Sequence, residues 1–178
     1  FLPSKPTNQF TKITVSCFSH QASMSKAKLI NLVKKAKVAS QTLGILSTAH
    51  KNKTLCELAD ALITLTPDIL KANAKDLKVA AQKDMAPAML DRLTLNEKRV
   101  KDMADAVIQV AKLSDPVGQV VEEYNHNQIH IKRVRIPLGV IGMIYEARPN
   151  VTIDAASLCF KSGNAVVLRG GSEAFHSN

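Results

Sequence analysis

The sequence predicts an α/β fold with N-terminal helices, a protruding β-hairpin arm and the first βαβ unit of an open parallel, Rossmann-like sheet. Apolar residues recur at the helical period of 3.6 from Ser25 to about residue 113, and at a period of two over 119–136. After Pro137, two apolar runs flank a further helical segment. This order of strand, helix and strand within about 35 residues is typical of a right-handed βαβ unit.

The composition narrows the class of protein. The chain has 178 residues, enough for one domain with its own core, and its aromatic fraction is 4%, so the core must be mostly aliphatic. No apolar run approaches the roughly 18 residues that span a bilayer, so we expect no membrane association. The net charge of +9 resides in residues 1–56, where scattered lysines occur without any acidic residue. We therefore expect a solvated helix face and a basic tail, and no nucleic-acid partner.

Residues 1–23 stand apart from the rest. They have no sustained hydrophobic period and no acidic residue, and they lack both arginine and an apolar core of the signal-peptide kind. They are either a targeting leader or translated sequence upstream of a true start at Met24. We expect an extraneous or disordered leader, and the first residue, Phe1, and the last, Asn178, suggest a fragment.

Helices are expected throughout 24–118. The first begins at Ser25 and ends near Gly44, and a short MLDRL segment precedes the last. The later helices begin at capping signals, namely Ser47, Thr66-Pro67-Asp68 and the capping box Thr94–Glu97. Ser114-Asp115-Pro116 ends this part.

Residues 119–137 are expected to form the hairpin arm. Its strands are 119–124 and 129–136, and Asn125-His126-Asn127 forms the turn between them. Neither face of the hairpin is cleanly apolar, so it should stand away from the main core and pack against another subunit.

Residues 138–178 are expected to begin the parallel sheet. The apolar run at 138–145 is typical of a strand buried on both faces, a helix follows over 151–161, and the second strand is 165–168. Ligands bind such sheets at the carboxyl ends of the strands, which here are the loops 145–150 and 169–173. Either loop contacts a ligand, or both are ordinary turns in which glycines supply positive φ.

Polar side chains in these loops are the candidate site residues. Arg169 can reach a phosphate or ribose, or can form a surface salt bridge, and Ser172 and Glu173 can bind the same ligand. Asn150 can present its amide to an oxyanion, or can cap the following helix. The dinucleotide fingerprint G-x-G-x-x-G does not occur.

The cysteines and histidines do not suggest a reactive site. Cys17, Cys56 and Cys159 are odd in number and have no metal-binding spacing, so reduced thiols in the cytoplasm, without metal or disulfide, are expected. Cys159 lies among apolar residues of a helix, where a thiol is usually inert. His126 and His130 fall in or near the hairpin, where a solvated role is expected.

Two long segments carry a resemblance to a known family. The segments PLGVIGMIYEARPNVTIDAASLCFKSGNAVVLRGGSEAFHSN, at 137–178, and MLDRLTLNEKRVKDMADAVIQVAKLSDPVGQV, at 89–120, closely resemble the γ-glutamyl phosphate reductase family. These enzymes, also called glutamate-5-semialdehyde dehydrogenases, resemble aldehyde dehydrogenases more loosely. The resemblance runs from about Met24 to Asn178, and the motifs YEARPN and LRGGSEA distinguish this family.

The resemblance implies an architecture and a reaction. An NADPH-binding domain would comprise 24–118 and 138–178, the arm at 119–137 would form a homo-oligomer, and the catalytic domain would be absent. The reaction would reduce γ-glutamyl phosphate to glutamate 5-semialdehyde in proline synthesis, through a cysteine thiolate and a thioester. That cysteine lies in a motif resembling PSTCN beyond this chain, so we expect the chain alone to be inactive.

The resemblance also assigns roles by position. Arg169 resembles the basic residue that contacts the adenosine ribose, with Gly170, Gly171 and Glu173 beside it in the cofactor site. Ser172 falls where NAD-preferring relatives place an acid, so a neutral group there would tolerate the 2′-phosphate of NADPH. Asn150 or Arg148 would occupy the place of the oxyanion amide, and Arg148 would contact the substrate.

Two other interpretations remain open at this point. The fold can serve a non-catalytic α/β nucleotide-binding or regulatory module that lacks the cysteine. The basic charge alone motivates a nucleic-acid-binding protein, which should then bind without residues 1–23 and lose affinity steeply with salt.

Overall fold

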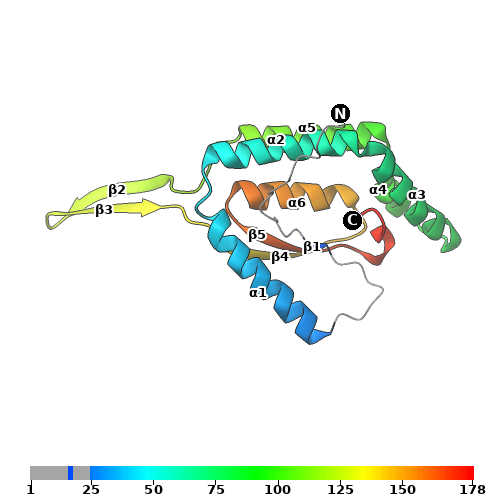
Figure 1. Ribbon diagram of the computed structural model, residues 1–178, viewed down its shortest axis with the longest axis horizontal. Helices are drawn as coiled ribbons and strands as arrows, with labels where there is room; N and C mark the ends of the chain where they lie inside the picture. Colours follow the sequence, from blue (N-terminus) through cyan, green and yellow to red (C-terminus); the bar gives the residue numbers. More distant parts are fainter. Residues whose placement is uncertain (1–15, 18–24) are drawn as a thin grey trace, which may run out of the picture.

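The computed structural model describes residues 16–17 and 25–178, and its elements form stacked layers (Figure 1). The central sheet contains β4 (Val140–Ile144) and β5 (Ala165–Arg169). Helix α6 (Pro149–Lys161) covers one face of this sheet, and α1 (Lys26–Leu43) packs on the other. Two further helices, α2 (Thr48–Thr64) and α5 (Glu97–Lys112), lie together on the outer side of α6.

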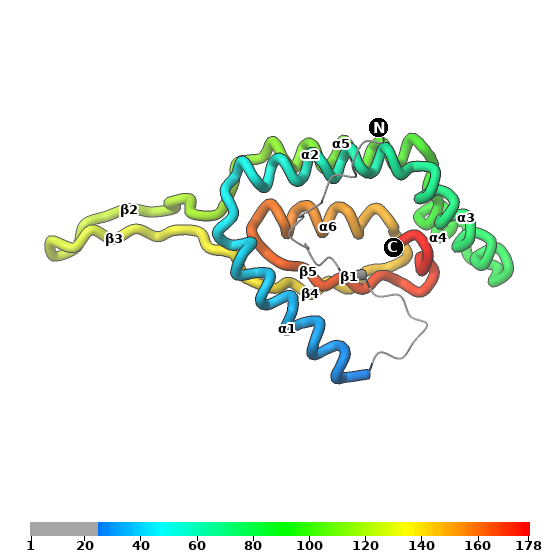
Figure 2. Tube along the Cα trace, in the orientation of Figure 1, coloured from blue at the N-terminus to red at the C-terminus, as the bar shows by residue number. Residues whose placement is uncertain are grey.

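The remaining elements lie at the two ends of these layers. A hairpin of β2 (Val120–His126) and β3 (Ile129–Val134) projects from one end (Figure 2). At the opposite end are α3 (Thr66–Gln82), α4 (Pro87–Leu93) and the short 3-10 turn η1 (Ser172–Ala174).

The predicted βαβ unit is confirmed. β4 and β5 pair in parallel from Val140 opposite Ala165 to Ile144 opposite Arg169, and α6 connects them. A third strand, β1 (Ser16–Cys17), pairs in parallel with the other edge of β5. These two residues lie within 1–23, the segment expected to be an extraneous or disordered leader. The rest of that segment lies outside the described residues.

The main core is aliphatic, as the composition predicts. It lies between α2, α5 and α6, where Leu55, Val100 and Val107 are almost completely buried. Burying each such side chain contributes about 1.5–3 kcal/mol relative to leaving it in water. A second cluster, in which Cys159 packs beside Val166, joins α6 to the sheet.

Two helix starts differ from the prediction because threonine hydroxyls bond backward. Thr66 Oγ1 donates to the Leu62 carbonyl oxygen at 3.0 Å, and α3 begins without a side-chain cap. Thr94 Oγ1 likewise donates to the Leu90 carbonyl oxygen at 2.7 Å. The cap of α5 is therefore Asn96, whose side chain accepts from the Arg99 amide at 2.8 Å. The expected capping box at Thr94–Glu97 is wrong.

The hairpin turn also lies further along the chain than predicted. Asn125 pairs with His130 inside the strands, and the turn consists of Asn127 and Gln128. Both turn residues have positive φ, 46° and 65°. A two-residue turn of this kind matches the right-handed twist of the strands.

β4 is less buried than the apolar run predicts. One face packs on α6, but Ile144 on the other is 79% exposed, and Leu138 just before the strand is 85% exposed. Among the described residues β4 has no neighbour on its second edge, and α1 crosses nearer the start of the strand. The expectation of burial on both faces is therefore wrong for this part of the protein.

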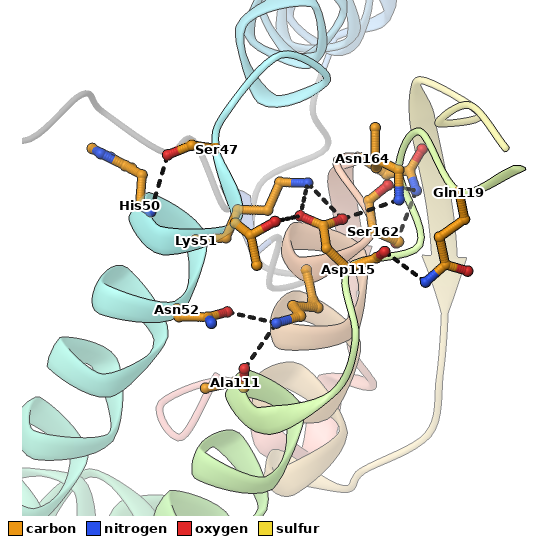
Figure 3. Close-up of polar contacts among 12 residues, drawn as sticks. Ser47, His50, Lys51, Asn52, Ala111, Asp115, Gln119, Ser162 and Asn164 are labelled. Carbon is orange, nitrogen blue, oxygen red and sulfur yellow. Dashed lines mark hydrogen bonds and ion pairs between the residues drawn. The ribbon is translucent and has the colours of Figure 1, made fainter. Parts of the chain in front are cut away.

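The Asp115 carboxylate, whose side chain is 10% exposed, connects α2 to the segment after α5 (Figure 3). Asp115 follows α5, and its two oxygens accept hydrogen bonds from Lys51 Nζ at 2.9 and 3.1 Å. Thr48 Oγ1 and the Val117 amide donate to the same carboxylate at 2.9 and 3.0 Å. Burial raises the pKa of Asp115, but the bonds from Lys51, Val117 and Thr48 together hold it below the usual value.

A second buried lysine extends this arrangement to α6. Lys161 Nζ donates to Asn52 Oδ1 at 2.5 Å and to the Ala111 carbonyl oxygen at 2.8 Å. Burial lowers the pKa of Lys161, with Asp115 opposing that shift. We call Lys51, Asp115, Thr48 and Lys161 the Asp115 network.

None of the described helices is long and apolar enough to cross a membrane.

Candidate functional site

The two loops that the sequence singles out meet at the carboxyl edge of the sheet. Ile144 and Arg169 are register partners at the ends of β4 and β5, and the Tyr145 amide donates to the Arg169 carbonyl oxygen at 3.1 Å. Arg169 is exposed there. The structure thus brings together the two groups of candidate residues, 145–150 and 169–173, as the parallel topology requires.

The glycines after β5 are needed for close packing. A Cβ on Gly170 would collide with the Asn178 side chain, and one on Gly171 would lie 2.6 Å from Glu173 Oε2 and 3.0 Å from the Ala147 amide. Neither residue belongs to the positive-φ group, which among the described glycines is Gly118, Gly139 and Gly163. The expectation that positive φ explains these two glycines is therefore wrong.

Ser172 and Glu173 form the start of η1 instead of an open loop. Ser172 is exposed, and its hydroxyl donates to Glu173 Oε1 at 2.9 Å. The neutral side chain that the sequence marks as a cofactor contact is therefore at the surface, next to the strand end that carries Arg169.

α3 anchors the segment that follows η1. The Asp76 carboxylate accepts from the His176 amide at 3.0 Å, the Ser177 amide at 2.8 Å and the Ser177 hydroxyl at 2.6 Å. Asn73, one turn earlier, donates to Ser177 Oγ at 2.9 Å and to the Leu93 carbonyl oxygen at 2.8 Å. Both side chains are buried. Sequence reasoning missed them, although they share a helix face with buried Ala80 at helical spacing.

The helix after β4 begins earlier than predicted. α6 starts at Pro149, in the first-turn position that suits proline, and Arg148 is its N-cap residue. Asn150 therefore lies within the first turn and is not the cap. Its side chain is exposed and donates through Nδ2 to Asp154 Oδ2 at 3.2 Å, which leaves its second N–H for another acceptor.

A pocket of about 500 Å³ opens beside this helix start, against α4 and α5. Its charged lining residues are Asp91, Arg92, Arg99, Asp102, Arg148 and Asp154. Arg148 is half-buried, and its Nε is fully buried without a hydrogen-bond partner. Burial raises the pKa of Asp154, and the hydrogen bond from Asn150 opposes that shift.

The described cysteines are not placed for nucleophilic chemistry. Cys159 is buried on α6, and burial raises the pKa of its thiol, which suppresses the reactive thiolate. Cys56 is exposed on α2, and neither is in a disulfide. Among the described residues, no group of three or more His, Cys, Asp or Glu is arranged to hold a metal ion.

The sequence of this chain is similar to those of known enzymes. The chain is 51% identical over 153 residues to γ-glutamyl phosphate reductase of Anoxybacillus flavithermus and 55% identical over 152 residues to that of Carboxydothermus hydrogenoformans. Each match covers 85% of this chain and 37% of the relative. This chain is a relative of the γ-glutamyl phosphate reductases. No family model matches it.

Solved structures agree. The γ-glutamyl phosphate reductase of Thermotoga maritima superposes with a TM-score of 0.82 at 41% identity, over 84% of this chain and 36% of that one. The Saccharomyces cerevisiae enzyme gives 0.80 at 33% identity, over 86% of this chain and 39% of that one. The chain spans little more than a third of the length of these reductases and corresponds to their N-terminal part.

The γ-glutamyl phosphate reductase relationship leaves the hairpin without a tested role. Its strands are exposed along almost their whole length, and His130 there bonds Glu123 Oε1 at 2.6 Å and Asn125 Oδ1 at 2.8 Å. Both contacts lie on the exposed hairpin surface, and the role of His130 stays a prediction.

Proposed function

We propose that this chain contributes the N-terminal part of an NADPH-dependent reductase that converts γ-glutamyl phosphate to glutamate 5-semialdehyde in proline synthesis. The carrying observation is that the loops containing YEARPN and LRGGSEA lie side by side at the carboxyl edge of a parallel sheet, in a chain 51–55% identical to reductases of that name. Free thiols at Cys56 and Cys159 support a cytoplasmic location.

The cofactor would lie against β5. Arg169 is exposed at the strand end, where a guanidinium can bind a ribose oxygen or a phosphate, and exposed Ser172 adds no negative charge that would repel a 2′-phosphate. Gly170, Gly171 and Glu173 complete this edge. When bound, NADPH supplies the hydride.

The reacting carbonyl would lie near the start of α6. The free N–H of Asn150 or the Arg148 guanidinium can stabilise negative charge on the acyl oxygen. The nucleophilic thiolate is expected from the part of the reductase that this chain does not match. This chain alone should therefore bind and orient without completing the reaction.

Turnover in the reverse direction tests the proposal. Reduction of NADP⁺ to NADPH with glutamate 5-semialdehyde and phosphate should be absent with this chain and present when it is joined to the remaining part of the Thermotoga maritima enzyme. A joined, folded protein without turnover would argue for a non-catalytic module. Turnover by this chain alone that Cys159→Ala abolishes would overturn the assignment of the nucleophile.

Arg169→Ala in the joined protein tests the cofactor site. A lost charge-assisted hydrogen bond is worth roughly 1.5–3 kcal/mol, so the KM for NADPH should rise about tenfold to a hundredfold. The KM for γ-glutamyl phosphate should change little. Lys71→Ala, which removes an exposed positive charge elsewhere, is the control and should change neither KM. An unchanged KM for NADPH would refute the role of Arg169.

The hairpin is proposed as an oligomerisation arm. It projects from the layers and exposes Val121, Tyr124 and Ile129 to solvent. Tyr124→Ser with Ile129→Ser should shift sedimentation toward a smaller species without changing the helical circular dichroism signal. An unchanged sedimentation coefficient would contradict this role.

A further inference from the structure

The pocket beside the start of α6 contains two kinds of charged residue. Arg99 has partners within the chain, since its guanidinium donates to the Asp91 carbonyl, to the Thr94 carbonyl oxygen at 2.6 Å and to Asp91 Oδ1 at 2.7 Å. This pair fastens the turn after α4 to α5. Arg92 Nη1 lies 3.4 Å from Glu146 Oε2 in an exposed ion pair. Arg99 and Arg92 thus each have a carboxylate partner within the chain.

Three other charged groups of the pocket remain open to a ligand. The Arg148 guanidinium forms no side-chain hydrogen bond or ion pair within residues 25–178, and its Nε is cut off from water. Asp154 accepts one bond, from Asn150, and is partly desolvated, while exposed Asp102 on α5 lies in no hydrogen bond or ion pair of the described structure. A charged ligand in the pocket would therefore displace no internal ion pair at these three groups.

We propose that this pocket binds the α-amino-acid end of the substrate, with Arg148 facing the α-carboxylate and Asp154 and Asp102 facing the α-ammonium group. The proposal rests on the proposed reductase function and names the part of the substrate that this chain recognises. The α-carbon of the substrate carries one ammonium group and one carboxylate. The pocket offers a charge opposite to each, since Arg148 is positive and Asp154 and Asp102 are negative. The Arg99–Asp91 ion pair holds the turn after α4 against α5, and this turn forms part of the pocket wall.

The position of the pocket agrees with this assignment. With Arg148 assigned to the α-carboxylate, Asn150 is the group left for the acyl oxygen, and it lines the same pocket as Asp154. A substrate with its reacting carbonyl at the start of α6 can therefore extend its other end along α5 and α6. An ammonium group beside Asp154 also offsets the desolvation of that carboxylate.

Three small probes separate the two contacts. L-Glutamate carries both α-groups, glutarate lacks the ammonium group, and 4-aminobutyrate lacks the α-carboxylate. Their dissociation constants are measured by titrating the ¹⁵N-labelled chain and following the amide signals of Asp102, Arg148 and Asp154. L-Glutamate should bind about tenfold tighter than either other probe, because each missing group removes one charge-assisted contact.

Single substitutions should remove one preference each. Asp154→Asn should abolish the preference for L-glutamate over glutarate and keep the preference over 4-aminobutyrate. Asp102→Asn should do the same, and because Asp102 is exposed this second variant is less apt to disturb folding. Arg148→Gln should do the reverse. Asp60→Asn, on the exposed face of α2, should change neither ratio.

The outcomes distinguish this inference from the reductase proposal. Unperturbed pocket amides, or ratios that ignore these substitutions, overturn the inference even if the joined protein is an active reductase. Tight binding of 4-aminobutyrate that equals L-glutamate would identify a simple cation site and also overturn it. Specific L-glutamate binding in a joined protein without turnover would keep the pocket and reject the reductase.

Discussion

The Asp115 network and the pocket at Arg148 both place charged side chains away from bulk water, but they differ in how completely those groups are satisfied. Lys51 is 0% exposed and Asp115 10%, and each finds its partners within the chain. In the pocket, Arg148 Nε is buried without any partner. Buried charges that are saturated internally belong to the fold, whereas unsaturated ones in a pocket indicate a ligand.

The two aspartates show the same contrast in their titration. Hydrogen bonds outweigh burial at Asp115 and lower its pKa, whereas burial outweighs the single bond at Asp154 and raises its pKa. The charged form of Asp115 therefore favours folding, and that of Asp154 opposes it.

Lys51→Met should have the largest effect on stability. It leaves the largely buried Asp115 carboxylate without its charged partner, and breaking such a pair costs roughly 3–5 kcal/mol. Urea denaturation measures the free energy of unfolding. Lys53→Met is the control, because that lysine is 77% exposed and contributes little. A loss at Lys51 no larger than at Lys53 would remove the contrast.

Asp76→Ala should rank second. It leaves the His176 and Ser177 amides without their acceptor, at roughly 1–3 kcal/mol for each group that stays buried. Hydrogen exchange should show the amides of 176–178 opening, while those of α2 and α5 stay protected. Asp60→Ala supplies the matched change at an exposed helix position. Full protection of 176–178 in the variant would contradict the anchoring role.

Asp154→Asn should barely change the stability of the ligand-free chain. The substitution removes the carboxylate charge that accepts the Asn150 hydrogen bond, and it also removes the cost of desolvating that charge. The free energy of unfolding should therefore stay within about 0.5 kcal/mol of the wild type. Thermal and urea unfolding measure it. A loss comparable to that of Lys51→Met would mean that Asp154 belongs to the fold.

The pH dependence should have opposite signs at the two aspartates. The folded pKa of Asp115 lies below the unfolded value of 3.8, so its stabilisation exists above that value and disappears as the pH falls through the folded pKa. The folded pKa of Asp154 lies above 3.8, so its ionisation reduces stability as the pH rises through the interval between the two values. Unfolding of Asp115→Asn and Asp154→Asn from pH 2.5 to 7, each subtracted from wild type, measures both; slopes of equal sign would refute the assignment.

The hydrophobic periodicity of the sequence correctly predicted the parallel βαβ unit. The strand, helix and strand of 138–168 and the loops at their carboxyl ends follow from apolar runs and their lengths. Local hydrogen bonding decided the details that periodicity missed. Thr66 and Thr94 bond backward and so do not cap, and the turn moves to Asn127–Gln128 to match the strand twist.

The candidate site was predictable only in part. Arg169 and Asn150 follow apolar strands, which is a local signal. The pocket joins Asp102 on α5 to Arg148 and Asp154 near α6, and no local pattern reports which helices meet there. One signal was present and overlooked, since Lys51 falls on the same helix face as Leu55, Ala59 and Leu62, where a lysine requires a buried partner.

The Asp76 anchor has a consequence for the order in which the chain can become ordered during synthesis. Its amide partners lie 100 and 101 residues further along the chain. At about 5–20 residues per second, the ribosome delivers them roughly 5–20 s after α3 has emerged. Until then α3 presents the Asp76 carboxylate to water, and this charge keeps that flank of the helix hydrated and out of premature apolar contacts. The nascent helices can therefore pack on one another first, and closure of the cofactor edge is the late step.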